Sequence, residues 1–161
     1  MTNHYAKVLT VSDGCYHGSR EDTSGEALRE LLFDRGFEVV ESRICPDGIE
    51  SVSARLFELS DDFHGLIVTT GGTGFTSRDL TPEATLKVIE REAPGIAEYS
   101  RSVNKLGMIS RGRCGIRAKS LIFNVPGSPK GACEMLEAVI DTISHAIDLL
   151  NDSSSQHPSN E

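Results

Sequence analysis

Cysteine and tryptophan are scarce in this sequence, which has four cysteines and no tryptophan among its 161 residues. The cysteines are Cys15, Cys45, Cys114 and Cys133, with no CxxC pair and no histidine cluster beside them. This spacing argues against a zinc site, and we interpret all four as free thiols. Long apolar runs and a signal-peptide core are also missing, so a cytoplasmic location with no membrane partner is expected.

Positive charge is in short supply as well. The 16 Lys and Arg residues against 24 Asp and Glu residues give a net charge of −8, which argues against a nucleic-acid partner. A local anion site remains compatible with this charge, because backbone N–H groups can hold a phosphate. Neither a P-loop nor a GxGxxG dinucleotide motif is present. The length suits one domain, predicted over residues 1–152, and residues 153–161 are predicted to be a polar, disordered tail.

Strands and helices are expected to alternate along most of the chain. Apolar, β-branched runs predict strands at 6–12, 37–45, 64–70, 113–117 and 120–125. Apolar residues at helical spacing predict helices at 23–36, 47–62 and 131–150, and two more starting near 81 and 94. This order is typical of a largely parallel sheet with helices on both faces. Ligands of such sheets bind beyond the carboxyl ends of the strands.

Three of the predicted helices have recognisable start signals. Thr23 and Glu26 have the spacing of a capping box, and Asp47 is a candidate cap for the helix that follows it. Thr81 is interpreted as a cap followed by Pro82 at the first helical position.

A glycine cluster follows the third predicted strand, where Gly71, Gly72, Thr73 and Gly74 form the run GGTG. Without side chains, its backbone N–H groups can approach an anionic or planar ligand closely. A tight turn that requires positive φ angles is an equally acceptable interpretation. Ser12, at the end of the first predicted strand, is expected at the same rim.

Three aspartates, Asp13, Asp47 and Asp79, are predicted to point into this cleft. Carboxylates beside an anion site suit Mg²⁺, which is usually bound through one or two carboxylates and shared with substrate phosphates. Taken singly, Asp13 and Asp47 are equally well explained as turn or cap residues, and Asp79 as a solvated loop charge.

A second rigid loop follows the last predicted strand, from Asn124 to Pro129. Its prolines fix the chain, and Gly127 and Ser128 are free to meet a ligand. The alternative is a plain connection between a strand and a helix. Because no Ser/His/Asp or Cys/His constellation is evident, nucleophilic catalysis is not favoured.

Four motifs together resemble the molybdopterin-binding MogA/MoaB family, which includes molybdopterin adenylyltransferase and the amino-terminal domain of gephyrin. They are TVSDGCYHGSREDTSG, CPDG, TTGGTGFTSRDLTPEAT and MISRGRCGIRAKSLIFNVPGSPKG, within a resemblance that runs from about Lys7 to Leu150. The resemblance implies a three-layer α/β/α sandwich with a mostly parallel sheet, commonly assembled as a homotrimer. It also implies adenylyl transfer from Mg-ATP to the terminal phosphate of molybdopterin, with the molybdate-inserting protein as a further partner.

The resemblance also implies roles for individual residues. Asp47 and Asp79 match the acidic positions of the family and would hold or orient Mg²⁺ near the reacting phosphates. The residues implied to contact molybdopterin or ATP are Ser12, Asp13, Gly71, Gly72, Thr73, Gly74, Ser110, Asn124, Pro126, Gly127 and Ser128. The alternative function is a molybdopterin-binding or scaffold module without catalysis.

Overall fold

A six-stranded mixed sheet forms the centre of the protein, described by a computed structural model over residues 3–152. The strands are β1 (His4–Val11), β2 (Phe37–Cys45), β3 (Gly65–Thr70), β4 (Arg91–Glu92), β5 (Cys114–Arg117) and β6 (Ser120–Val125). Their order in the sheet is β2-β1-β3-β6-β5-β4. The first four in this order run parallel, whereas β5 is antiparallel to β6 and β4 to β5. The prediction of a mostly parallel sheet is therefore confirmed.

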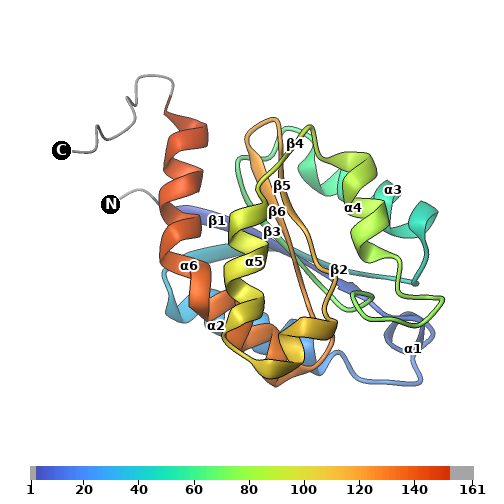
Figure 1. Ribbon diagram of the computed structural model, residues 1–161. Coiled ribbons are helices and arrows are strands. Elements are labelled where there is room, and N and C mark those ends of the chain that lie inside the picture. The colour runs from blue at the N-terminus through green and yellow to red at the C-terminus, as the bar shows by residue number, and fades with distance from the viewer. Residues whose placement is uncertain (1–2, 153–161) are drawn as a thin grey trace.

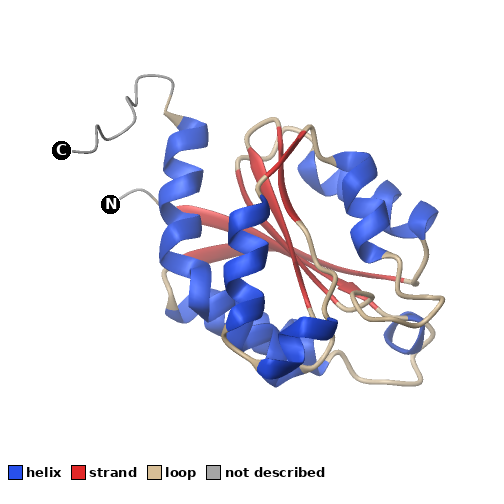
Figure 2. Cartoon of the chain, viewed as in Figure 1, coloured by secondary structure: helices blue, strands red, loops and turns tan. Residues whose placement is uncertain are grey.

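Helices cover both faces of the sheet, so the three-layer prediction is confirmed as well (Figure 1). The helices are α1 (Asp13–Tyr16), α2 (Thr23–Asp34), α3 (Ile49–Ser60), α4 (Thr81–Val88), α5 (Pro94–Ser102), α6 (Pro129–Asn151) and the 3-10 helix η1 (Lys105–Ile109). Figure 2 shows the strands between one layer made by α2, α5 and α6 and another made by α3 and α4. None of the helices within residues 3–152 is both long and apolar enough to span a membrane.

The two layers bury separate apolar clusters against the sheet. One cluster joins α2 and α6 to the sheet and includes the fully buried Leu28, Leu136 and Phe123. The other joins α3 and α4 to the opposite face and includes Leu56. All six residues of β3 and all six of β6 are buried, because both strands are covered from two sides.

The predicted start signals of three helices are wrong in detail. The side chain that caps α2 is Asp22, whose Oδ1 accepts from the Gly25 N–H at 2.9 Å, and Thr23 is the first helical residue. Helix α3 begins after Gly48 without a side-chain cap, so Asp47 does not cap it. Thr81 lies inside α4 and uses its hydroxyl elsewhere. In each case a tertiary contact decided which side chain was available.

Several short elements escaped sequence prediction, namely α1, β4 and η1, and α6 begins two residues before its predicted start. The predicted disordered tail at 153–161 lies outside the described residues, and the domain span of 1–152 stays a prediction. More important for the site is the strand order. Because β1 lies between β2 and β3, the chain connections diverge on either side of it, which is where α/β sheets bind ligands.

The cap of α2 gives a first testable prediction. Replacing Asp22 by Ala removes the acceptor for the Gly25 N–H and for the Thr10 hydroxyl, so we expect the free energy of unfolding to fall by about 1 to 2 kcal/mol. Thr23→Ala is the matched control, expected to change it by less than about 0.5 kcal/mol. Urea denaturation measures both. A larger loss in Thr23→Ala than in Asp22→Ala would restore Thr23 as the cap.

Candidate functional site

Two cavities open side by side at the carboxyl ends of the parallel strands, with volumes of about 800 and 470 Å³. Four residues line both of them: Gly72, Asp79, Gly127 and Ser128. The first cavity is also lined by Ser12, Asp47 and Gly71, and the second by Thr73, Gly74, Ser110 and Pro126. Thirteen residues were predicted at the site, and these eleven line its walls. The other two, Asp13 and Asn124, line neither cavity.

The glycine pair after β3 lies very close to residues of two neighbouring elements. Gly71 has a φ of +100°, and a Cβ there would lie 2.2 Å from the Val11 carbonyl oxygen. Gly72 has a φ of +68°, and a Cβ there would lie 2.3 Å from Thr81 Oγ1. The tight-turn interpretation therefore holds for both residues. The interpretation of the pair as a backbone surface for a ligand also stands, because the same two residues line the first cavity.

The loop after β6 is fastened to the glycine pair. The Gly71 N–H donates to the Val125 carbonyl at 3.2 Å, and the Thr70 hydroxyl donates to the Pro126 carbonyl at 2.7 Å. Ser128 caps α6, since its Oγ accepts from the Gly131 N–H at 3.2 Å. This loop is thus both a strand-to-helix connection and a shared wall of the two cavities.

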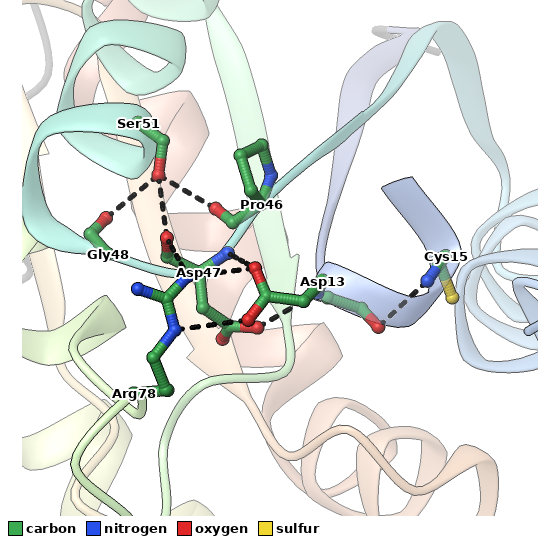
Figure 3. Close-up of polar contacts among 8 residues, drawn as sticks. Asp13, Cys15, Pro46, Asp47, Gly48, Ser51 and Arg78 are labelled. Carbon is green, nitrogen blue, oxygen red and sulfur yellow. Dashed lines mark hydrogen bonds and ion pairs between the residues drawn. The ribbon is translucent and has the colours of Figure 1, made fainter. Parts of the chain in front are cut away.

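Asp13 and Asp47 are joined by reciprocal hydrogen bonds (Figure 3). The Asp13 N–H donates to Asp47 Oδ2 at 3.0 Å, and the Asp47 N–H donates to Asp13 Oδ1 at 3.1 Å. Arg78 approaches from the β3–α4 loop and donates to both Asp13 carboxylate oxygens, at 2.9 and 3.1 Å, and to the Asp47 carbonyl at 3.0 Å. Asp13 is therefore neutralised behind the cavity, whereas no cation in the described part of the chain pairs with the Asp47 carboxylate.

Three carboxylate residues line the first cavity, and two of them, Asp47 and Asp79, suit a hard cation. Burial raises the pKa of Asp47, and the neighbouring negative charges of Asp13 and Asp79 raise it further. A cation between Asp47 and Asp79 would relieve this repulsion. One Asp79 oxygen, Oδ2, already accepts from the Thr76 N–H at 2.9 Å. Residues 3–152 hold no group of three or more His, Cys, Asp or Glu side chains arranged for a metal, so the candidate site consists of two carboxylates.

Asn124 is buried in the interior next to the site and bonds to residues of neighbouring elements. The residue is 2% exposed, and its side-chain amide donates to the hydroxyls of Thr69 and Thr85 at 2.9 and 3.0 Å. The remaining oxygen accepts from the Arg113 N–H at 3.0 Å. Because each polar atom of this amide has a protein partner, the structure assigns Asn124 to the interior and not to the cavity wall.

Comparison with known proteins identifies the family. A sequence profile described as the probable molybdopterin binding domain matches residues 7–145, which include every residue of the candidate site. The chain belongs to this molybdopterin-binding domain family. A molybdopterin adenylyltransferase from Helicobacter pylori strain J99 is 40% identical over 157 residues, covering 93% of this chain and 89% of that protein. The molybdopterin adenylyltransferase of Escherichia coli K12 is 39% identical over 142 residues, covering 83% and 72%.

Solved structures of the molybdopterin-binding family have the same fold. The molybdopterin biosynthesis enzyme MoaB of Thermus thermophilus superimposes with a TM-score of 0.87 and 43% identity, covering 91% of this chain and 96% of that one. The MoaB of Pyrococcus furiosus, described as synthesising tungsten cofactor, gives a TM-score of 0.83 and 30% identity, covering 94% and 99%. Both share the three-layer arrangement described above.

Some residues of this molybdopterin-binding domain were missed by sequence reasoning. Arg78 lies within a quoted motif, but its pairing with Asp13 joins positions 65 residues apart and has no local signal. Leu106 and Ile109 line the second cavity from η1, which was not predicted. The only local sign of this cavity wall in the sequence is the pair of apolar residues Leu106 and Ile109 shortly before Ser110.

The raised pKa of Asp47 gives a prediction for stability against pH. In the wild type, folding favours the protonated carboxyl, so stability falls as the pH rises from below 3.8 through the higher pKa of the folded state. Asp47→Asn lacks this titration and can still accept from the Asp13 N–H. We expect the variant to gain stability relative to the wild type as the pH rises, with a plateau near neutral pH. Thermal unfolding in metal-free buffer from pH 3 to 7 measures the difference, and a variant that loses stability relative to the wild type as the pH rises would contradict the prediction.

Proposed function

We propose that this protein transfers an adenylyl group from Mg-ATP to the terminal phosphate of molybdopterin. A phosphate oxygen of molybdopterin attacks the α-phosphorus of ATP, the bond to the β-phosphate breaks, and pyrophosphate leaves. Adenylylated molybdopterin is the product. The observation that carries the proposal is that Asp47 and Asp79 line the same cavity as the glycine pair. The substrates in this proposal are taken from the names of the relatives, which are called molybdopterin adenylyltransferase.

Charge and alignment account for the proposed chemistry, since nucleotidyl transfer needs no covalent enzyme intermediate. Asp47 and Asp79 would hold Mg²⁺, which supplies positive charge against the phosphates when it is bound. The glycine run Gly71–Gly74 leaves room for a phosphate against the main chain. Both cavities share a wall at Gly72 and Asp79, which favours two ligands meeting at that wall.

Three further statements belong to the same proposal. The protein works as a homotrimer, which light scattering tests, since a monomer mass in solution would overturn it.

It acts in the cytoplasm and transfers its product to the molybdate-inserting protein. An assay containing both proteins tests the transfer, because an unchanged rate of molybdate insertion would contradict a partnership.

A direct assay decides between catalysis and binding. Purified protein is incubated with molybdopterin, ATP and Mg²⁺, and adenylylated molybdopterin is sought by mass spectrometry. We expect product that requires both the protein and Mg²⁺. Binding of molybdopterin without product, under conditions in which an active relative turns over, would favour the binding or scaffold module. That alternative is supported by gephyrin of Dictyostelium discoideum, which is 35% identical over 158 residues, covering 89% of this chain and 22% of that protein.

Asp79→Asn separates the two functions within one protein. An amide cannot supply the charge that holds a cation, so we expect the rate of adenylyl transfer to fall by about 100-fold or more. Molybdopterin binding should be largely retained, because the glycine walls are unchanged. The matched control is Asp141→Asn, an exposed position on α6 outside both cavities. Product formation and binding are measured side by side, and a fully active Asp79→Asn variant would remove Asp79 from the mechanism.

A further inference from the structure

The β3–α4 loop, residues 71–80, carries Asp79 to the wall shared by the two cavities, so its position decides where that carboxylate lies. Inside the loop, the Thr76 N–H donates to Asp79 Oδ2 at 2.9 Å and the Asp79 N–H donates to the Thr76 carbonyl at 3.1 Å. These two bonds fix the shape of the turn. They do not fix the turn relative to the rest of the rim, which is done by contacts with other elements. Arg78 supplies such contacts on one side through Asp13 and the Asp47 carbonyl, and the opposite side of the loop needs its own.

Arg111 supplies the contact on that opposite side, at both ends of the turn. Its Nε donates to the Gly74 carbonyl at 2.9 Å and its Nη2 donates to the Asp79 carbonyl at 2.6 Å. Its backbone N–H donates to the Thr73 carbonyl at 2.8 Å. A guanidinium is planar and presents its donors in a fixed fork, so one side chain sets the separation and the orientation of two carbonyls.

Glu83 of α4 holds the guanidinium in place through an ion pair with Nη1. The two side chains are 36% and 38% exposed, so the ion pair by itself contributes little to stability. Its effect is orientational, because it aims the remaining donors at the loop. Arg111 lines neither of the two large cavities and faces a separate hollow of about 270 Å³ behind the rim.

We propose that Arg111 is a positioning residue that places Asp79 for cation binding through the carbonyls of Gly74 and Asp79. It acts from behind the wall and touches no ligand. This proposal rests on the proposed adenylyl transfer for its effect on rate, whereas its effect on the loop is independent of any activity. The loop can shift when the fork is lost, and a displacement of about 1 Å at a reacting centre costs on the order of 100-fold in rate.

The test compares Arg111→Gln with Arg113→Gln. Arg113 is two residues away and is also exposed, but its side chain pairs with Glu92 on β4 instead of with the loop. Hydrogen exchange followed by mass spectrometry reports the loop directly, through the bonded amides of Thr76, Asp79 and Thr81. We expect Arg111→Gln to speed exchange at least tenfold in peptides covering 73–81 and to leave the core helices unchanged. Arg113→Gln should match the wild type.

Turnover gives the second readout. Arg111→Gln should lower kcat by about 10- to 100-fold and raise the Mg²⁺ concentration needed for half-maximal rate, while KM for ATP changes little. Arg111→Lys, which keeps the charge but loses the fork, should lie between this variant and the wild type. If Arg111→Gln unfolds the protein, the Lys variant provides the same two measurements.

Each outcome has a defined meaning. Exchange and Mg²⁺ dependence that equal those of Arg113→Gln would overturn the positioning role. Faster exchange throughout the chain would also overturn it, because it would show a general loss of stability. If the wild type forms no product while Arg111→Gln still loosens only the loop, the positioning role stands and the proposed adenylyl transfer fails.

Discussion

The rim of the sheet depends on the close approach of Gly71 to the end of β1. Any larger residue would place its Cβ 2.2 Å from the Val11 carbonyl oxygen. At the same residue, the backbone N–H is bonded to the Val125 carbonyl at the end of β6. At this one position the end of β3 is bonded to the end of β6 and lies close against the end of β1, so the loops that leave the three strands are near one another. The conformational freedom of glycine costs stability in a folded chain, so this contact must be supported by many others around it.

Charge is distributed unevenly at this rim. Asp13 is paired with Arg78, whereas the Asp47 carboxylate has no such partner within residues 3–152. Burial raises the pKa of Asp47, and the nearby carboxylates of Asp13 and Asp79 raise it further. A phosphate approaching this wall meets repulsion from the carboxylates and attraction from the glycine backbone. A cation bound by the carboxylates would replace this repulsion with attraction. The arrangement therefore favours an anionic ligand that arrives with a divalent cation.

Large elements were predictable because their signals are local. The buried strands and α6 are long apolar patterns whose burial follows from their spacing. Ten of the eleven cavity-lining residues were expected because the ends of parallel strands meet at one edge of the sheet, and Ser110 was implied only by the family resemblance. What local pattern could not reveal is the choice among competing partners. Thr23 has the spacing of a cap, but Asp22 is held in place by the Thr10 hydroxyl and caps α2 instead.

The same limit explains the supporting residues. Asn124 looks like a ligand contact in the sequence, because it lies near the carboxyl end of β6 at the correct edge of the sheet. Only the folded chain brings Thr69 and Thr85 to its amide. Arg78 and Arg111 bond to residues that are 65 and 32 positions distant, so no periodicity marks them. Most residues that line the two cavities lie at predictable strand ends, whereas the residues that hold them in place are paired only by the tertiary structure.

Support of this kind decides how much a ligand must reorganise the site. The Thr81 N–H bonds to the Gly72 carbonyl and its hydroxyl to the Gly71 carbonyl, both at 3.0 Å, so the first residue of α4 is fixed to the glycine pair. The pair is thus bonded to β6 on one side and to α4 on the other. Ordering this backbone costs entropy during folding, before any ligand is present. Binding then loses less conformational freedom, and more of the interaction energy is available to align the reacting groups.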